Sequence, residues 1–127
     1  MTDQASPGAT PRPATPPTSD RLTAVLSTIT AQARRTNLTR TAELEAALER
    51  AADHGLDPAG WAAAERTAHQ LAGSAGTFGF DGVSEIARSL ERFFVESGAA
   101  GIADPVRLAG ARSQLERANA QLNDDSD

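Results

Sequence analysis

The sequence predicts an all-α protein: an antiparallel up-down four-helix bundle that follows a disordered N-terminal tail. Apolar residues recur every three or four positions in four separate segments, as they do on the buried faces of amphipathic helices. Short stretches that contain glycine or an Asp-Pro pair separate these segments, and helices joined by short loops pack antiparallel. No stretch alternates apolar and polar residues for long enough to form a strand.

The chain is organised as one helical domain between two tails. Its 127 residues fall within the usual size of a single domain. Residues 1–19 hold five of the seven prolines among small and polar residues, so they have little apolar surface to bury and are expected to be disordered. Residues 20–122 are expected to form the bundle, and residues 123–127 an acidic C-terminal tail. We interpret both tails as solvated ends, with interaction tails as the alternative.

The first two helices are expected to be separated by a short turn at Gly55. The first begins at a cap on Ser19 or Asp20 and runs to about His54. The second begins with Asp57 as N-cap and Pro58 at the first helical position, where a backbone N–H is not needed. Their apolar seams are Leu22, Val25, Leu26, Ile29, Ala33, Leu44, Leu48 and Ala51 in the first helix, and Trp61, Ala64, Ala68, Leu71, Ala75 and Phe78 in the second.

The last two helices are defined by the same signals. Asp81 is expected to cap the third helix, and Ser97-Gly98 to end it. Asp104 and Pro105 repeat the cap-plus-proline start, and the fourth helix runs to Leu122. Their seams are Val83, Ile86, Ala87, Leu90, Phe93 and Phe94 in the third helix, and Leu108, Ala111, Leu115, Ala118 and Leu122 in the fourth.

The composition excludes several function classes. The net charge is −5 and the arginines are spread almost singly, so the concentrated basic face that nucleic acid requires is missing. Cysteine is absent, which removes disulfides, thiolate metal sites and thiol catalysis. There is neither a secretory signal nor an apolar run of the roughly 18–20 residues that cross a bilayer. We expect a cytoplasmic monomer without nucleic-acid or membrane partners.

One histidine on the second helix has unusual surroundings. His69 follows the seam residue Ala68, so it flanks the buried stripe, and Glu65, Arg66, Ala72, Gly73 and Gly76 share its face. Each glycine inside a helix costs about 1 kcal/mol relative to alanine, and this helix uses alanine freely elsewhere. The simplest explanation is that Ala72, Gly73 and Gly76 clear space for a bulky group that approaches the imidazole.

The third helix should place a carboxylate beside this histidine. If the connection is centred near Phe80, facing residues of the two antiparallel helices have numbers that add to about 160. Glu91 then faces His69, where it can orient the ring and leave its other nitrogen free as a nucleophile. Arg88 faces position 72, near the outer edge of the histidine. A slip of one residue would exchange Glu91 for Leu90 or Arg92.

The segment Ala68-His69-Gln70-Leu71-Ala72-Gly73-Ser74-Ala75-Gly76-Thr77-Phe78-Gly79 resembles the core motif of histidine-containing phosphotransfer (HPt) domains. In that family, leucine stands two positions and glycine four positions after an exposed helical histidine, and a later glycine closes the helix. The likeness continues through residues 85–91 and covers roughly residues 20–122.

This resemblance implies a function for His69. The family's four-helix bundle carries a phosphoryl group on histidine between aspartates of response-regulator receiver domains, and some members accept it from a histidine kinase. Members often place Gln or Glu on the following helix beside the histidine, which corresponds to Glu91 here. The protein is then a phosphoryl carrier in a two-component phosphorelay and not an ATP-binding kinase. No cofactor is expected on it, because Mg²⁺ belongs to the receiver domain.

The sequence departs from the family pattern at Ala72, where many members have lysine. Our hypothesis is that Arg88, or Arg66 one turn before His69, provides the missing positive charge. Arg92 is a further candidate for contact with the partner. These arginines, with the small residues beside His69, define the expected docking surface.

Two other interpretations remain open. Carboxylate-bridged metal bundles use Glu-x-x-His pairs from two helices, but Glu65 and His69 are four residues apart and only one inward histidine exists. We therefore expect no metal site. The more serious alternative is a non-catalytic adaptor that keeps the HPt fold and binds receiver or kinase domains without phosphotransfer.

Overall fold

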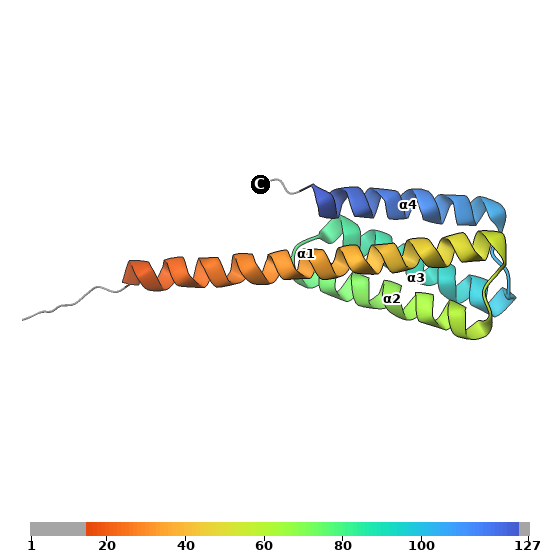
Figure 1. The fold of residues 1–127 in the computed structure, drawn as a ribbon, viewed down its shortest axis with the longest axis horizontal. Coiled ribbons are helices and arrows are strands. Elements are labelled where there is room, and N and C mark those ends of the chain that lie inside the picture. The colour runs from red at the N-terminus through yellow and green to blue at the C-terminus, as the bar shows by residue number, and fades with distance from the viewer. Residues whose placement is uncertain (1–14, 125–127) are drawn as a thin grey trace, which may run out of the picture. The chain divides into compact units, whose positions relative to one another are not determined.

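The computed structural model describes residues 15–124 and confirms the predicted all-α bundle. Within this range it contains four helices and no strand: α1 (Thr15–Asp53), α2 (Pro58–Thr77), α3 (Asp81–Ala100) and α4 (Pro105–Asn123) (Figure 1). Of the tails expected at residues 1–19 and 123–127, residues 1–14 and 125–127 lie outside the described residues. The chain divides into two compact units, residues 1–32 and 33–127, and the bundle belongs to the second.

Helix α1 begins earlier than predicted. It starts at Thr15, so the expected cap at Ser19 or Asp20 is wrong, and residues 15–19 are helical where a disordered tail was expected. Pro16 and Pro17 fall in the first turn, where the backbone N–H groups have no partner within the helix. Proline at these positions therefore favours a helix start instead of preventing one.

The second unit is a bundle formed by residues 33–53 of α1 together with α2, α3 and α4. The connections between successive helices are only residues 54–57, 78–80 and 101–104, so successive helices run antiparallel (Figure 1). Apolar side chains from all four helices fill one continuous core. Its fully buried large side chains include Leu44, Leu48, Leu71, Leu90, Phe94, Leu115 and Leu122.

Two buried polar side chains connect this part of α1 to its neighbours. Asn37 Nδ2 donates a hydrogen bond of 3.1 Å to Ser74 Oγ on α2. On the other side, Thr41 Oγ1 lies 3.0 Å from Asn119 Oδ1 on α4. Because buried polar groups require partners, these pairs help to fix how α1 is rotated against α2 and α4.

The predicted caps are confirmed at two helices and wrong at the third. Asp57 accepts a hydrogen bond of 2.8 Å from Gly60 N, and Asp104 accepts one of 3.0 Å from Arg107 N. At α3 the cap position is Phe80, and Asp81 is already helical and makes no side-chain cap bond. Asp81 therefore acts on α3 only through its negative charge in the first turn.

The predicted end of α3 at Gly98 is also wrong. The helix continues to Ala100, and Gly101 ends it in the left-handed conformation, with φ of 78°. A Cβ at Gly98 would lie 3.1 Å from the Cβ of Trp61. Gly98 is thus explained by the close approach of α3 to Trp61 on α2. In the sequence, a glycine required by such close packing cannot be distinguished from a glycine that ends a helix.

The first unit carries the part of the predicted α1 seam that is not buried. Leu22, Val25, Leu26 and Ile29 are each between 40% and 60% exposed. Their spacing places them on one face of α1, as predicted, but they are not part of the bundle core.

Across the described residues, none of the helices combines the length and the hydropathy that a membrane span requires.

Candidate functional site

His69 lies on the flank of the bundle with its ring in solvent. The neighbouring residue Ala68 is completely buried on α2, and this sets the face of the helix on which His69 falls. The imidazole side chain is 74% exposed. A histidine so placed is anchored by a rigid helix and is still accessible to a large partner.

Glu91 on α3 contacts this histidine. Its Oε2 lies 3.0 Å from His69 Nδ1, across the interface between α2 and α3. An ionised carboxylate has only acceptors, so Nδ1 must be the protonated nitrogen in this contact. The other nitrogen, Nε2, then carries the lone pair, and the exposure of the ring leaves it accessible. This arrangement is the one that a nucleophilic Nε2 would require.

Several contacts set the register that brings His69 and Glu91 together. The α2–α3 connection is tight: Phe80 N donates to Ala75 O at 2.8 Å, and Gly79 adopts a φ of 85° that favours glycine. The Arg34 guanidinium from α1 lies 5.5 Å from the centre of the Phe80 ring. These contacts fix the start of α3 relative to the end of α2.

A buried serine adds a link closer to the histidine. Ser84 on α3 donates a hydrogen bond of 2.8 Å from Oγ to the backbone carbonyl of Ala72 on α2. Ser84 was not recognised from the sequence, although a signal exists: it lies seven residues before Glu91, on the same face of its helix. A serine beside an apolar stripe can be buried when it finds a carbonyl on the facing helix.

The three small residues near His69 have different surroundings. A Cβ at Gly73 would meet nothing within 4 Å, so this position opens to solvent. A Cβ at Gly76 would lie 3.3 Å from Ser84 Oγ, so Gly76 allows the close approach of α3. Ala72 is buried and belongs to the core. Ala72, Gly73 and Gly76 were expected to leave space for a group that approaches the imidazole, and of these three only Gly73 has open surroundings.

The three candidate arginines line different parts of the surface around the site. Arg66 lines the same hollow as His69 and Glu91. Arg88 lines a neighbouring hollow together with Gly73, Gly76 and Ser84. Arg92 lines neither of these hollows. Within residues 15–124 none of the three forms an ion pair, so their guanidinium groups remain available to an incoming anion.

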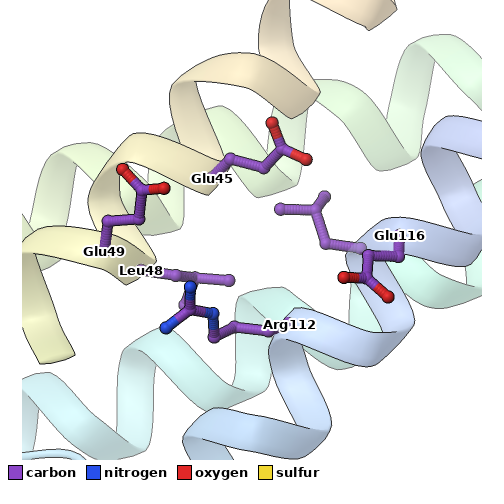
Figure 2. Close-up of a pocket in the computed structure, with 6 residues that line it drawn as sticks. Glu45, Leu48, Glu49, Arg112 and Glu116 are labelled. Carbon is purple, nitrogen blue, oxygen red and sulfur yellow. The ribbon is translucent and has the colours of Figure 1, made fainter.

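A separate hollow lies between α1 and α4 and contains none of the predicted site residues. Glu45 and Glu49 project toward it from α1, and Arg112 and Glu116 from α4 (Figure 2). Its floor is formed by Leu48 and Leu115, which are part of the core. In the described part of the chain, no group of three or more histidine and acidic side chains is arranged to hold a metal ion.

A family comparison identifies the domain. Residues 29–125, most of the chain, match the family of Hpt domains. The chain belongs to the Hpt domain family. Hpt domains act in histidine phosphotransfer within phosphorelays, where they interact with receiver domains and kinases. Comparison with curated proteins and with solved structures gave no match.

The contact between His69 and Glu91 in this Hpt domain leads to a test of Glu91. Replacing Glu91 with alanine removes the acceptor that holds the proton on Nδ1, and a free imidazole in water prefers its proton on Nε2. We expect the ¹⁵N chemical shifts of the His69 ring in Glu91→Ala to move toward the Nε2–H tautomer. Without a free lone pair on Nε2 in most molecules, phosphorylation of His69 should slow by about ten-fold.

Glu85→Ala is the matched control, since Glu85 is an exposed acid about two turns earlier on α3 and is not the partner of His69. Rates are compared with phosphoramidate as a small donor, because Glu85 lines the hollow that contains Arg88 and Gly73. Unchanged ring shifts in Glu91→Ala would contradict the orienting role.

Proposed function

We propose that this Hpt domain accepts a phosphoryl group on Nε2 of His69 and passes it on within a cytoplasmic two-component phosphorelay. The donor is the phosphoaspartate of a response-regulator receiver domain, or a histidine kinase. The observation that carries this proposal is the exposed imidazole whose Nδ1 contacts Glu91 at 3.0 Å.

The proposed step needs little from this chain besides the nucleophile. The lone pair of Nε2 attacks the phosphorus atom of the aspartyl phosphate; the N–P bond forms, the P–O bond to the aspartyl carboxylate breaks, and that carboxylate leaves with the electron pair. The phosphorylated ring keeps its proton on Nδ1 and is positively charged. Glu91 then stabilises the product, because its carboxylate already lies beside that proton.

The surroundings of His69 suit the approach of a folded partner. The open surface at Gly73 allows another backbone to come close to the ring, and the Mg²⁺ required for the transfer is expected on the receiver domain. Arg66 shares the hollow of His69, so it is the better placed of the two arginines to substitute for the lysine that many family members have at position 72. Arg88, beside Gly73, is placed to meet the partner.

The central experiment is phosphotransfer from a phosphorylated receiver domain. The wild-type chain should acquire an acid-labile, alkali-stable label, as expected for phosphohistidine, and His69→Gln should acquire none. His54→Gln is the control, because it changes the chain's other histidine and should leave labelling unchanged. If several receivers bind the wild-type chain without labelling it, the adaptor interpretation is correct and the proposal fails.

A bulky side chain at position 73 should separate docking from chemistry. Gly73→Gln should fold, because a Cβ there would meet nothing within 4 Å and glutamine is a better helix former than glycine. We expect its labelling by a receiver domain to slow by at least ten-fold, since the side chain occupies the docking surface. Labelling by phosphoramidate, a small donor, should remain within about two-fold of wild type. Equal slowing with both donors would contradict a docking role for this surface.

The arginines can be ranked by the lifetime of the phosphohistidine. Arg66→Gln should shorten this lifetime by about two- to five-fold, the modest effect typical of an exposed ion pair. Arg88→Gln should affect transfer from the receiver more than the lifetime. Arg92→Gln is the matched control, because Arg92 lines neither hollow. A lifetime that changes only in Arg88→Gln would reverse the assignment of the two residues.

A further inference from the structure

The apolar stripe in the first half of α1 is a feature that the proposed function does not use. Leu22, Val25, Leu26 and Ile29 stand on one face of the helix and remain 40% to 60% exposed. These residues were expected to form part of the seam of the first helix, but they are not part of the bundle core. Four large apolar side chains that follow one another on a helix indicate a contact surface.

Burial of the apolar face would stabilise this part of α1. Residues 19–32 include many serine, threonine and β-branched residues, which are weak helix formers. The segment continues a helix that is packed from Ala33 onward, and a contact on its own apolar face would add to its stability. Residues 1–14 are not suited to cover it, because Met1 is their only large apolar side chain.

The stripe is complementary to a second copy of itself. In an antiparallel pair centred between Val25 and Leu26, Leu22 of each copy lies level with Ile29 of the other, because both residues are equally far from the centre. The Val25 and Leu26 side chains of both copies then surround the two-fold axis. Every apolar residue of the stripe is matched by an apolar residue of the partner.

The charges on this segment do not oppose self-association. Asp20 and Arg21 are the only charged residues among residues 19–32, and they cancel. In the same antiparallel pair they lie level with Ala31 and Thr30, so no like charges face one another. This neutrality contrasts with the net charge of −5 on the whole chain.

We propose that residues 19–32 of α1 form an antiparallel homodimer through Leu22, Val25, Leu26 and Ile29. A contact between two helical segments of this length is smaller than the roughly 800 Å² per partner of a stable complex. The dimer is therefore weak and depends on protein concentration.

Cysteine cross-linking of the full chain tests both the contact and its direction, because the native sequence has no cysteine. Leu26→Cys lies next to the two-fold axis and should form disulfide-linked dimers under mild oxidation. Leu22→Cys and Ile29→Cys should cross-link efficiently only when the two variants are mixed. Ala24→Cys, on the opposite face of the helix, is the control and should form no disulfide-linked dimer.

Sedimentation equilibrium supplies an independent measurement. The average mass of the wild-type chain should rise toward that of a dimer between micromolar and millimolar concentration. Leu26→Glu should raise the dissociation constant at least ten-fold, whereas Ala24→Glu, with the same charge on the opposite face, should leave it within about two-fold. Both variants should still accept a phosphoryl group from phosphoramidate on His69, which shows that the bundle is folded.

Three results would overturn the proposal. A mass that stays monomeric up to millimolar concentration would exclude the homodimer. Cross-linking of Ala24→Cys as efficient as that of Leu26→Cys would exclude this face. Efficient cross-linking of Leu22→Cys by itself would exclude the antiparallel arrangement.

Discussion

The hydrogen bond between His69 and Glu91 depends on the register of α2 against α3, and the proposed chemistry depends on that bond. A shift of one residue would place Leu90 or Arg92 beside the imidazole, and neither can accept a proton from Nδ1. The register is held at one end by the turn at Gly79 and Phe80, and closer to the site by the bond from Ser84 to the Ala72 carbonyl. Glycine at position 76 is part of the same arrangement, since it gives Ser84 room to approach.

The sequence predicted those features that follow from periodicity and from the length of a connection. The helical seams from Ala33 onward except Phe78, the caps at Asp57 and Asp104, and the pairing of His69 with Glu91 all belong to this class. Features that depend on the distance between two helices were not predictable. Gly98 was interpreted as a helix end, and the structure shows that Trp61 packs against it. A glycine looks the same in a sequence whether it ends a helix or admits a neighbour.

Periodicity also does not show what covers an apolar face. The spacing of Leu22, Val25, Leu26 and Ile29 continues into the seam at Ala33 and Leu44, so one amphipathic helix was predicted with one buried face. The same spacing of apolar residues occurs in a buried part and in an exposed part of α1. From Ala33 onward the face is buried by α2, α3 and α4, and Asn37 and Thr41 add specific polar partners. Before Ala33 the face is exposed. Whether an apolar face is buried depends on the helices that pack against it, and the sequence of one helix does not specify these partners.

The electrostatics of the site are decided by a few local charges. The chain carries a net charge of −5, which alone would repel a phosphoryl group. At physiological ionic strength, however, charges are screened over about 8 Å, so an incoming phosphoryl group responds mainly to the residues that line the site. Arg66 and Arg88 line the hollows around His69 and Gly73 without an ion pair among the described residues to neutralise them. Acidic side chains line the same hollows: Glu65 and Glu91 lie with Arg66, and Asp81 and Glu85 lie with Arg88. Of these acids, Glu91 has its carboxylate 3.0 Å from Nδ1. The site is therefore mixed in charge. In the proposed function the arginines meet the phosphoryl group, and Glu91 meets the proton of the charged imidazole.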